Sequence, residues 1–277
     1  MGVRIAVGAG LLALVAAAAA VPAFAEPGAA ALPSANMEAV VKAAQIDPIR
    51  ADDTMTPGAK ASVLLVEQAL DAKNLLDPTY VDGYFGTKTI DAYAAYQRSL
   101  GYTGLDASGL PGRTSLQTLG EARFTVTNTL TPGSRLTYHG ATMNTRTKAM
   151  LVAAEGLLGA SLGITQGSYN PGGDPDSAGT HDGGGVLDIS VSGMTETRQT
   201  TVVRRLREVG FAAWRRTPSQ GPWGYHIHAV AISDTDMSPS AQHQVGDYYL
   251  GKNGLANHAP DDGPQVTKVT WEEYQRA

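Results

Sequence analysis

The stretch GTHDGGGVLDIS, from Gly179 to Ser190, sets one histidine before three consecutive glycines and one aspartate within an apolar run. Three glycines are unfavourable in a strand, because glycine loses more backbone freedom on folding than any other residue. Their presence indicates an unusual turn or a close backbone approach before a strand over 186–191. His181 and Asp188 are both potential metal ligands, so the stretch raises the question of a third ligand elsewhere.

That third ligand is offered by the stretch WGYHIHAV, at residues 223–230. Side chains at positions i and i+2 of a strand point to the same face, so His226 and His228 project together. Two neighbouring strands could bring His181, Asp188 and one or both of these histidines to one point. Three protein ligands and an open water position are typical of catalytic Zn²⁺.

The surrounding pattern predicts an α+β fold with a mainly antiparallel sheet. We expect helices over 144–159, over 195–210 and from Ser238 onward. We expect strands within 161–169, 186–191, 211–217 and 224–232. Helices and strands that follow one another without regular βαβ alternation favour α+β over a parallel sheet.

The first 25 residues have the pattern of a secretory signal peptide. An apolar run from Leu11 to Val21 follows Arg4, and Ala23-Phe24-Ala25 forms a small-x-small cleavage site. The run is short for a membrane span, although an uncleaved anchor is the alternative. We therefore expect a secreted protein, extracellular or associated with the cell wall. The chain has no cysteine, so a core or a metal bound through histidines and carboxylates must hold it together.

The charge balance excludes some partners. The formal net charge of the 277 residues is −5, so the sequence lacks the excess of basic residues that is typical of nucleic-acid-binding proteins. No later apolar stretch is long enough to cross a bilayer, so we expect no membrane partner after signal cleavage, and a monomer.

The N-terminal half is predicted to be helical. Residues 26–58, rich in alanine and proline, are expected to be a linker with one short helix near 37–44. Apolar spacing then predicts helices over 62–75 and 87–100 and a shorter one from Thr114. Residues 121–140 are expected to form a hairpin around Pro132-Gly133, and the polar residues after Gly254 a loose tail.

This helical stretch resembles the small peptidoglycan-binding domain of bacterial wall hydrolases. The resemblance covers most of 60–120. It depends on Val66, Leu70, VDGYFG at 81–86, Thr89, Tyr96, Gln97, Gly109, Gly112, Thr114 and Leu119. It implies a three-helix domain that binds peptidoglycan. The alternative is a helical spacer without a ligand.

The second half resembles another family. The pattern His181-x6-Asp188 followed by His226-x-His228 is similar to the zinc signature shared by D-Ala-D-Ala carboxypeptidases and the hedgehog signalling domain. The resemblance implies that His181, Asp188 and His228 bind Zn²⁺. It also implies that His226 is a catalytic group aimed at the reacting carbonyl.

Together these patterns divide the chain into six segments. They are a signal peptide at 1–25, a linker at 26–58, a peptidoglycan-binding domain at 59–121, a connector at 122–143, a zinc carboxypeptidase-like domain at 144–253 and a polar tail at 254–277.

The sequence departs from the second family's pattern at three positions. Gly179 replaces the usual serine two residues before the first histidine. Tyr225 stands where many members carry an acidic general base, three residues before the last ligand. The strand before the metal loop lacks the arginine that grips the substrate carboxylate, and Arg215 and Arg216 are candidates to replace it.

The leading interpretation is a secreted zinc metallopeptidase that hydrolyses amide bonds in the peptide stem of peptidoglycan, as a D,D-carboxypeptidase or endopeptidase. The first alternative is a non-catalytic wall-binding protein whose zinc site is structural. The missing acid at Tyr225 favours this alternative. The second is a sugar-cleaving wall enzyme that uses Asp174 and Asp176 as paired carboxylates.

Overall fold

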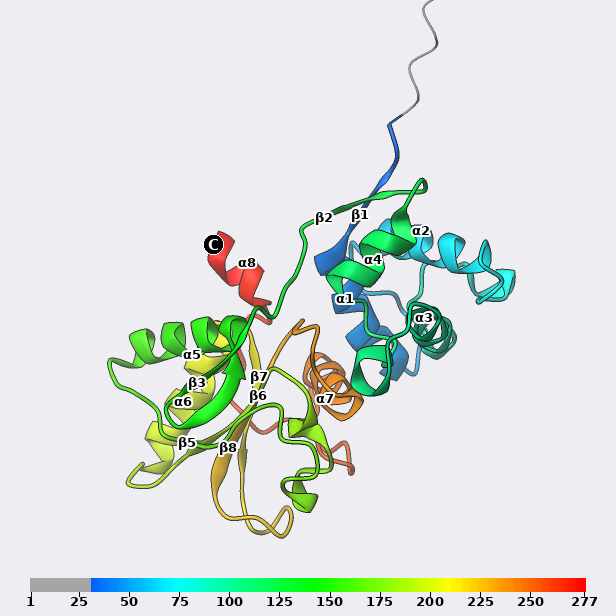
Figure 1. Cartoon of the computed structure of the whole chain (residues 1–277). Helices are drawn as coiled ribbons and strands as arrows, with labels where there is room; N and C mark the ends of the chain where they lie inside the picture. The colour runs from blue at the N-terminus through cyan, green and yellow to red at the C-terminus, as the bar shows by residue number, and fades with distance from the viewer. Residues whose placement is uncertain (1–30) are drawn as a thin grey trace, which may run out of the picture. The chain divides into compact units, whose positions relative to one another are not determined.

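A computed structural model of the chain describes residues 31–277. Within it, Leu32–Ala277 forms one compact α+β unit, with helices first and a four-stranded antiparallel sheet after them (Figure 1). The signal peptide expected at 1–25 lies outside the described residues. None of the helices in 31–277 is long and apolar enough to cross a membrane.

The N-terminal part is built from four α-helices. They are α1 (Met37–Ile46), α2 (Lys60–Asp71), α3 (Thr87–Ser99) and α4 (Arg113–Gly120), with short 3₁₀ turns at Asp47–Ile49, Pro78–Tyr80 and Gly104–Ala107. Helices α2, α3 and α4 lie where the apolar spacing predicts them. Helix α3 begins at Thr87, the first residue of the predicted range, and Gly86 is its N-cap.

The described part of the expected linker is folded. Strand β1 (Ser34–Asn36) leads into α1, whose first turn is capped by the Asn36 side chain on the amide of Ala39. Met37, Val40 and Val41 are fully buried, and α1 contacts both α2 and α7. The short helix expected near 37–44 is therefore confirmed, but it packs into the core and does not stand in a linker, because its apolar side chains recur at helical spacing.

The hairpin expected within 121–140 around Pro132-Gly133 is not formed, and a different hairpin follows it. Strand β2 (Thr125–Thr127) pairs with β1 in parallel. Strands β3 (Arg135–Tyr138) and β4 (Ala141–Asn144) form the antiparallel hairpin. Its turn is His139-Gly140, with φ of 49° and 77°. Two positive φ angles match the turn type whose twist suits a two-residue hairpin, so this pair and not Pro132-Gly133 forms the turn.

The C-terminal part contains the sheet, in the order β5-β6-β8-β7 (Figure 1). Its strands are β5 (Ile164–Gln166), β6 (Val186–Ser190), β7 (Phe211–Arg216) and β8 (His226–Ala231), and its helices are α5 (Thr145–Leu158), α6 (Glu196–Glu208) and α7 (Pro239–Tyr249). The expected antiparallel sheet is confirmed. Gly159, in the left-handed region, is the C-cap of α5, and α7 begins after Ser238, whose hydroxyl caps it.

The two faces of the sheet have different neighbours. Side chains alternate along each strand, so Leu187 and Ile227 pack with apolar residues of α5 and α6. Val186 and Val230 face the opposite way and pack with apolar residues of α7. Asp188 lies two residues after Val186 on β6, so its side chain shares the face that α7 covers.

The polar tail is ordered. Asp261 pairs with Arg207 of α6 at 2.8 Å, and both side chains are almost fully buried. The last helix, α8 (Trp271–Arg276), begins with a capping box between Thr270 and Glu273. The expectation of a loose tail was wrong, because a buried ion pair fixes this segment and Trp271 and Tyr274 pack against the core beneath the sheet.

Candidate metal centre

Strand register brings the central residues together. Asp188 on β6 and His228 on β8 are direct cross-strand partners. His181 enters from the short turn Thr180–Asp182, just before the glycine run. A side chain on Gly183 would collide with the backbone oxygen of Asp236, and Gly185 has a φ of 81°. The glycines therefore allow the close backbone approach that the sequence predicts.

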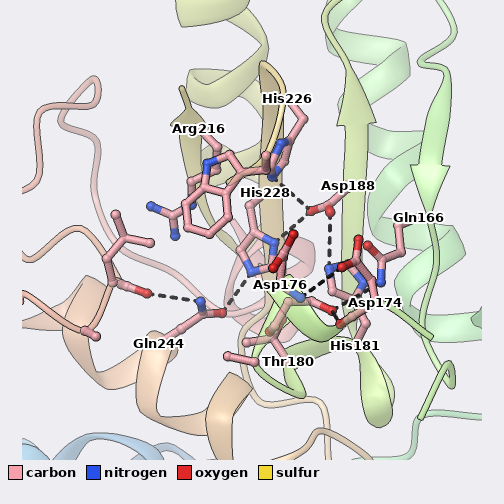
Figure 2. A pocket seen from close by; sticks show the side chains of 16 residues that line it. Gln166, Asp174, Asp176, Thr180, His181, Asp188, Arg216, His226, His228 and Gln244 are labelled. Atoms are coloured by element: carbon pink, nitrogen blue, oxygen red, sulfur yellow. Dashed lines mark hydrogen bonds and ion pairs between the residues drawn. The ribbon is translucent and has the colours of Figure 1, made fainter. Parts of the chain in front are cut away.

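Three imidazoles converge on the Asp188 carboxylate (Figure 2). Oδ1 lies 2.8 Å from Nδ1 of His228 and 3.7 Å from Nε2 of His226. Oδ2 lies 3.4 Å from Nε2 of His181. His181, Asp188 and His228 are buried and each offers a potential ligand atom, all within 4.8 Å of one another, so this group could hold a metal ion.

The other nitrogen of each ring is fixed by an oxygen acceptor. His181 Nδ1 lies 2.9 Å from the carbonyl of Gly167, and His226 Nδ1 lies 2.9 Å from that of Gly224. Carbonyl oxygens only accept, so both nitrogens carry the proton.

His228 is fixed in the same way by a side-chain amide. Its Nε2 lies 2.8 Å from Oε1 of Gln244. The Gln244 amide cannot be reversed, because its Nε2 donates to the carbonyl of Gly254 at 3.0 Å. Nε2 of His228 is therefore the donor in this contact.

When the three rings are neutral, the nitrogen of each ring that faces Asp188 therefore carries a lone pair and no proton. A carboxylate is also only an acceptor, so lone pairs meet unless a proton or a metal cation lies between them. Nε2 of His181 is buried without a hydrogen-bond partner among the described residues. This arrangement matches metal-binding histidines, whose second nitrogen usually donates to a carbonyl or carboxylate.

Electrostatics favour the protonation states that metal ligands need. Burial lowers the pKa of His228, despite the opposing charge of Asp188. Burial acts to raise the pKa of Asp188, but donated protons and positive charge on the His181 and His228 rings outweigh burial and hold that pKa well below its usual range, as a bound cation would. A neutral imidazole and an ionised carboxylate are the ligand forms.

The group opens into a pocket of about 280 Å³, near the lower end of the roughly 300–1,000 Å³ typical of ligand sites. Its polar and aromatic lining comprises Gln166, Asp174, Asp176, Ser177, Thr180, His181, Asp188, Arg216, Trp223, His226, His228 and Gln244. Asp174 and Asp176, predicted as a carboxylate pair, thus line the same pocket as the histidines.

Of the two candidate arginines, only Arg216 lines the pocket. Its Nη1 donates to the carbonyl of Asn253 at 2.7 Å, while Nη2 is buried without a partner in the described part of the chain. Burial lowers the pKa of Arg216 to about 10, which leaves it charged at neutral pH. Arg215 instead pairs with the exposed Glu196.

The departures from the family pattern have structural counterparts. Gly179 has a φ of 73°, a left-handed conformation that explains a glycine where the pattern has serine. Tyr225 is 62% exposed and supplies no acid. Gln244 was missed by the sequence analysis, because its contact with His228 depends on how α7 packs on the sheet.

Comparisons with protein families, with curated proteins and with solved structures gave no match to this chain.

Proposed function

We propose that the protein is a secreted, zinc-dependent hydrolase of amide bonds in the peptide stem of peptidoglycan. The observation that supports it most is the convergence of ring nitrogens of His181 and His228 on the buried carboxylate of Asp188. The substrate class comes from the sequence resemblances of both halves. The two parts of the proposal are tested separately.

The metal ligands in this proposal are His181 through Nε2, Asp188, and His228 through Nδ1. Two imidazoles and a carboxylate suit Zn²⁺, and three protein ligands leave a position for water. Bound zinc supplies a water of lowered pKa and polarises the carbonyl to be cleaved.

Other pocket side chains would act directly on the substrate. His226 is less buried than the ligand histidines, with 18% of its side chain exposed, and when its Nε2 also carries a proton this nitrogen is suited to donate to a developing oxyanion. Asp174 and Asp176 line the pocket and offer the proton-accepting carboxylate that is missing at Tyr225. The partnerless Nη2 of Arg216 suits a substrate carboxylate.

The VDGYFG loop is the proposed contact with the wall polymer. Its backbone is held by Glu67 of α2, whose Oε2 accepts from the amides of Asp82 and Gly83 at 3.1 and 2.7 Å. The loop borders a surface pocket that includes Tyr80, 41% exposed. Attachment there would raise the local concentration of stem peptide around the second site.

The test is metal analysis of the purified full chain, paired with digestion of peptidoglycan fragments and mass analysis of the products. His181→Ala, Asp188→Ala and His228→Ala should each lose one equivalent of zinc and all cleavage. His139→Ala is the matched control, because His139 also pairs with a carboxylate but belongs to no group of three potential ligands among residues 31–277. Full zinc content in all three variants would refute the metal site.

Wall binding is tested by sedimentation with insoluble peptidoglycan. Tyr80→Ala should reduce the fraction of protein that pellets. Leu105→Ala, which removes another exposed apolar side chain away from the loop pocket, should not. Pelleting no greater than that of an unrelated protein would refute the binding role.

The second candidate is a non-catalytic wall-binding protein with a structural metal site. The absence of an acid at Tyr225 favours it. A wild-type protein that binds zinc and pellets with peptidoglycan, yet releases no stem fragment, would establish this alternative.

A further inference from the structure

A second group of potential metal ligands lies on α7 and the segment after it. His243 and Asp247 are four residues apart on α7, so they share one face of the helix. His258 returns to this face from the following segment. The three residues each offer a potential ligand atom, all within 4.8 Å of one another. None of them lines the pocket around Asp188.

The Asp247 carboxylate is the unusual member of this group. Only 2% of its side chain is exposed, and Oδ2 lies 2.8 Å from Nδ1 of His258. Oδ1 is buried and has no hydrogen-bond partner among the described residues. A buried, ionised oxygen without a partner is costly, because the lost hydration is not replaced. A cation beside Asp247 would remove this cost.

The two histidines lie at the surface and close to each other. Their ring centroids are 5.3 Å apart, and 42% of the His258 side chain is exposed. His258 has a φ of 47°, a left-handed conformation that is uncommon outside glycine. The His258 side chain is thus held beside Asp247 although its backbone adopts an energetically unfavourable conformation.

We propose that His243, Asp247 and His258 bind a second Zn²⁺. Two imidazoles and one carboxylate favour zinc over Ca²⁺ or Mg²⁺, which prefer oxygen ligands. The exposed histidines give the ion access from solvent, and water completes its coordination.

The consequence of this site is structural, because it ties the segment 252–259 to α7. That segment forms part of the wall of the first pocket, through Gly254, Leu255 and Ala256. The carbonyl of Asn253 accepts from Arg216, and that of Gly254 accepts from Gln244. The second ion therefore stabilises the wall that positions both side chains.

The experiment is a zinc titration of the metal-free full chain, with bound zinc counted after gel filtration. The wild type should bind two equivalents, and His243→Gln and His258→Gln should each bind one. Loss of a ligand should weaken the second site by more than about a hundredfold, since loss of even an outer partner costs about 10–100-fold. His139→Gln, the matched control, should still bind two.

Two further variants distinguish zinc binding at the first site from zinc binding at the second. Asp188→Asn should retain one equivalent of zinc, and the double variant Asp188→Asn with His258→Gln should bind none. If only the first site fails, the wild type binds one equivalent that depends on His258. Equal zinc binding by the wild type and both glutamine variants would overturn the proposal.

Hydrogen exchange gives a second readout that does not depend on stoichiometry. Zinc should slow exchange of the amides in 252–259 in the wild type and in Asp188→Asn, but not in His258→Gln. His243 is exposed on the helix surface, so His243→Gln should fold normally. It tests the same site if His258→Gln folds poorly. Unchanged exchange in the wild type on adding zinc would contradict the structural role.

Discussion

Oε1 of Gln244 accepts from Nε2 of His228 at 2.8 Å, and this contact turns the other nitrogen of the ring toward Asp188. The Gln244 amide is itself anchored on the carbonyl of Gly254. This series of hydrogen bonds from Gly254 through Gln244 fixes both the orientation and the tautomer of His228. Gln244 itself makes no hydrogen bond to Asp188.

Gln244→Leu should weaken zinc binding at the first site by about 10–100-fold, because the acceptor that fixes the His228 tautomer is lost. Competition with a chelator dye measures this change. Gln199→Leu is the matched control, since Gln199 of α6 is largely buried and its amide donates to the backbone carbonyl of Met194. Equal zinc affinity in both variants would show that Gln244 plays no part in binding.

Arg216→Met should raise KM for stem peptides with a free terminal carboxylate by about 10–100-fold, which corresponds to losing a hydrogen bond to a charged group. An amidated peptide should show little difference between wild type and variant. Arg215→Met is the control, because Arg215 does not line the pocket. Retained zinc in Arg216→Met separates substrate binding from collapse of the site. A similar rise in KM for the amidated peptide would argue against carboxylate recognition.

His226→Ala should keep the first zinc but lose turnover by about 100–1,000-fold, the usual cost of one oxyanion donor. The reason is that Nε2 of His226 is farther from Asp188 than Nδ1 of His228, at 3.7 against 2.8 Å. Metal analysis and stem-peptide kinetics on the same sample check both parts. Zinc lost from His226→Ala and kept by His228→Ala would mean that the two histidines exchange roles.

Much of the metal centre could be predicted from the sequence, because two strands with period two fix where side chains point. Once β6 and β8 are adjacent, the register decides that Asp188 faces His228. The rest depends on contacts between distant segments. Gln244 reaches His228 only through the packing of α7, and Arg216 is distinguished from Arg215 only by which face of β7 lies over the pocket.

Helices and strands could be predicted where apolar residues recur at regular spacing. The packing of α1, the position of the hairpin turn and the order of the tail could not. Helix α1 was expected, but its packing into the core was not, because its surroundings are rich in alanine and proline and suggested a linker. The hairpin turn at His139-Gly140 lacks the usual turn residues in its first position. The tail after Gly254 is held by a buried ion pair and by two isolated aromatic side chains, Trp271 and Tyr274, which a mainly polar composition does not reveal.

Asp261→Ala should destabilise the protein by about 3–5 kcal/mol, because Arg207 would remain buried without its counter-charge. The Arg207 guanidinium is also fixed by the carbonyls of Ala213 and Pro264, so it cannot turn to solvent easily. Denaturant unfolding measures the loss. Asp262→Ala removes the exposed neighbouring carboxylate and should change stability little. A comparable loss in both variants would point to the tail backbone and not to the ion pair.

Glu67 should make the protein less stable as pH rises. Burial raises the pKa of Glu67 to about 7 from 4.5, despite hydrogen bonds from Gly83 and Thr89 that favour the ionised form. The folded state therefore holds more protons than the unfolded state between about pH 4.5 and 7, so the free energy of unfolding falls across this window. The fall is up to about 3 kcal/mol at 1.36 kcal/mol for each pKa unit.

Glu67→Gln should abolish this fall, because the amide oxygen can still accept from Asp82 and Gly83 while the amide nitrogen donates to the Thr89 hydroxyl. The variant should match the wild type near pH 4.5 and exceed its stability above pH 7. Denaturant unfolding of the full chain at several pH values checks this, with Asp91→Asn as a control that removes an exposed carboxylate from α3. Wild-type and Glu67→Gln curves that remain parallel across the window would show that Glu67 does not control the pH dependence.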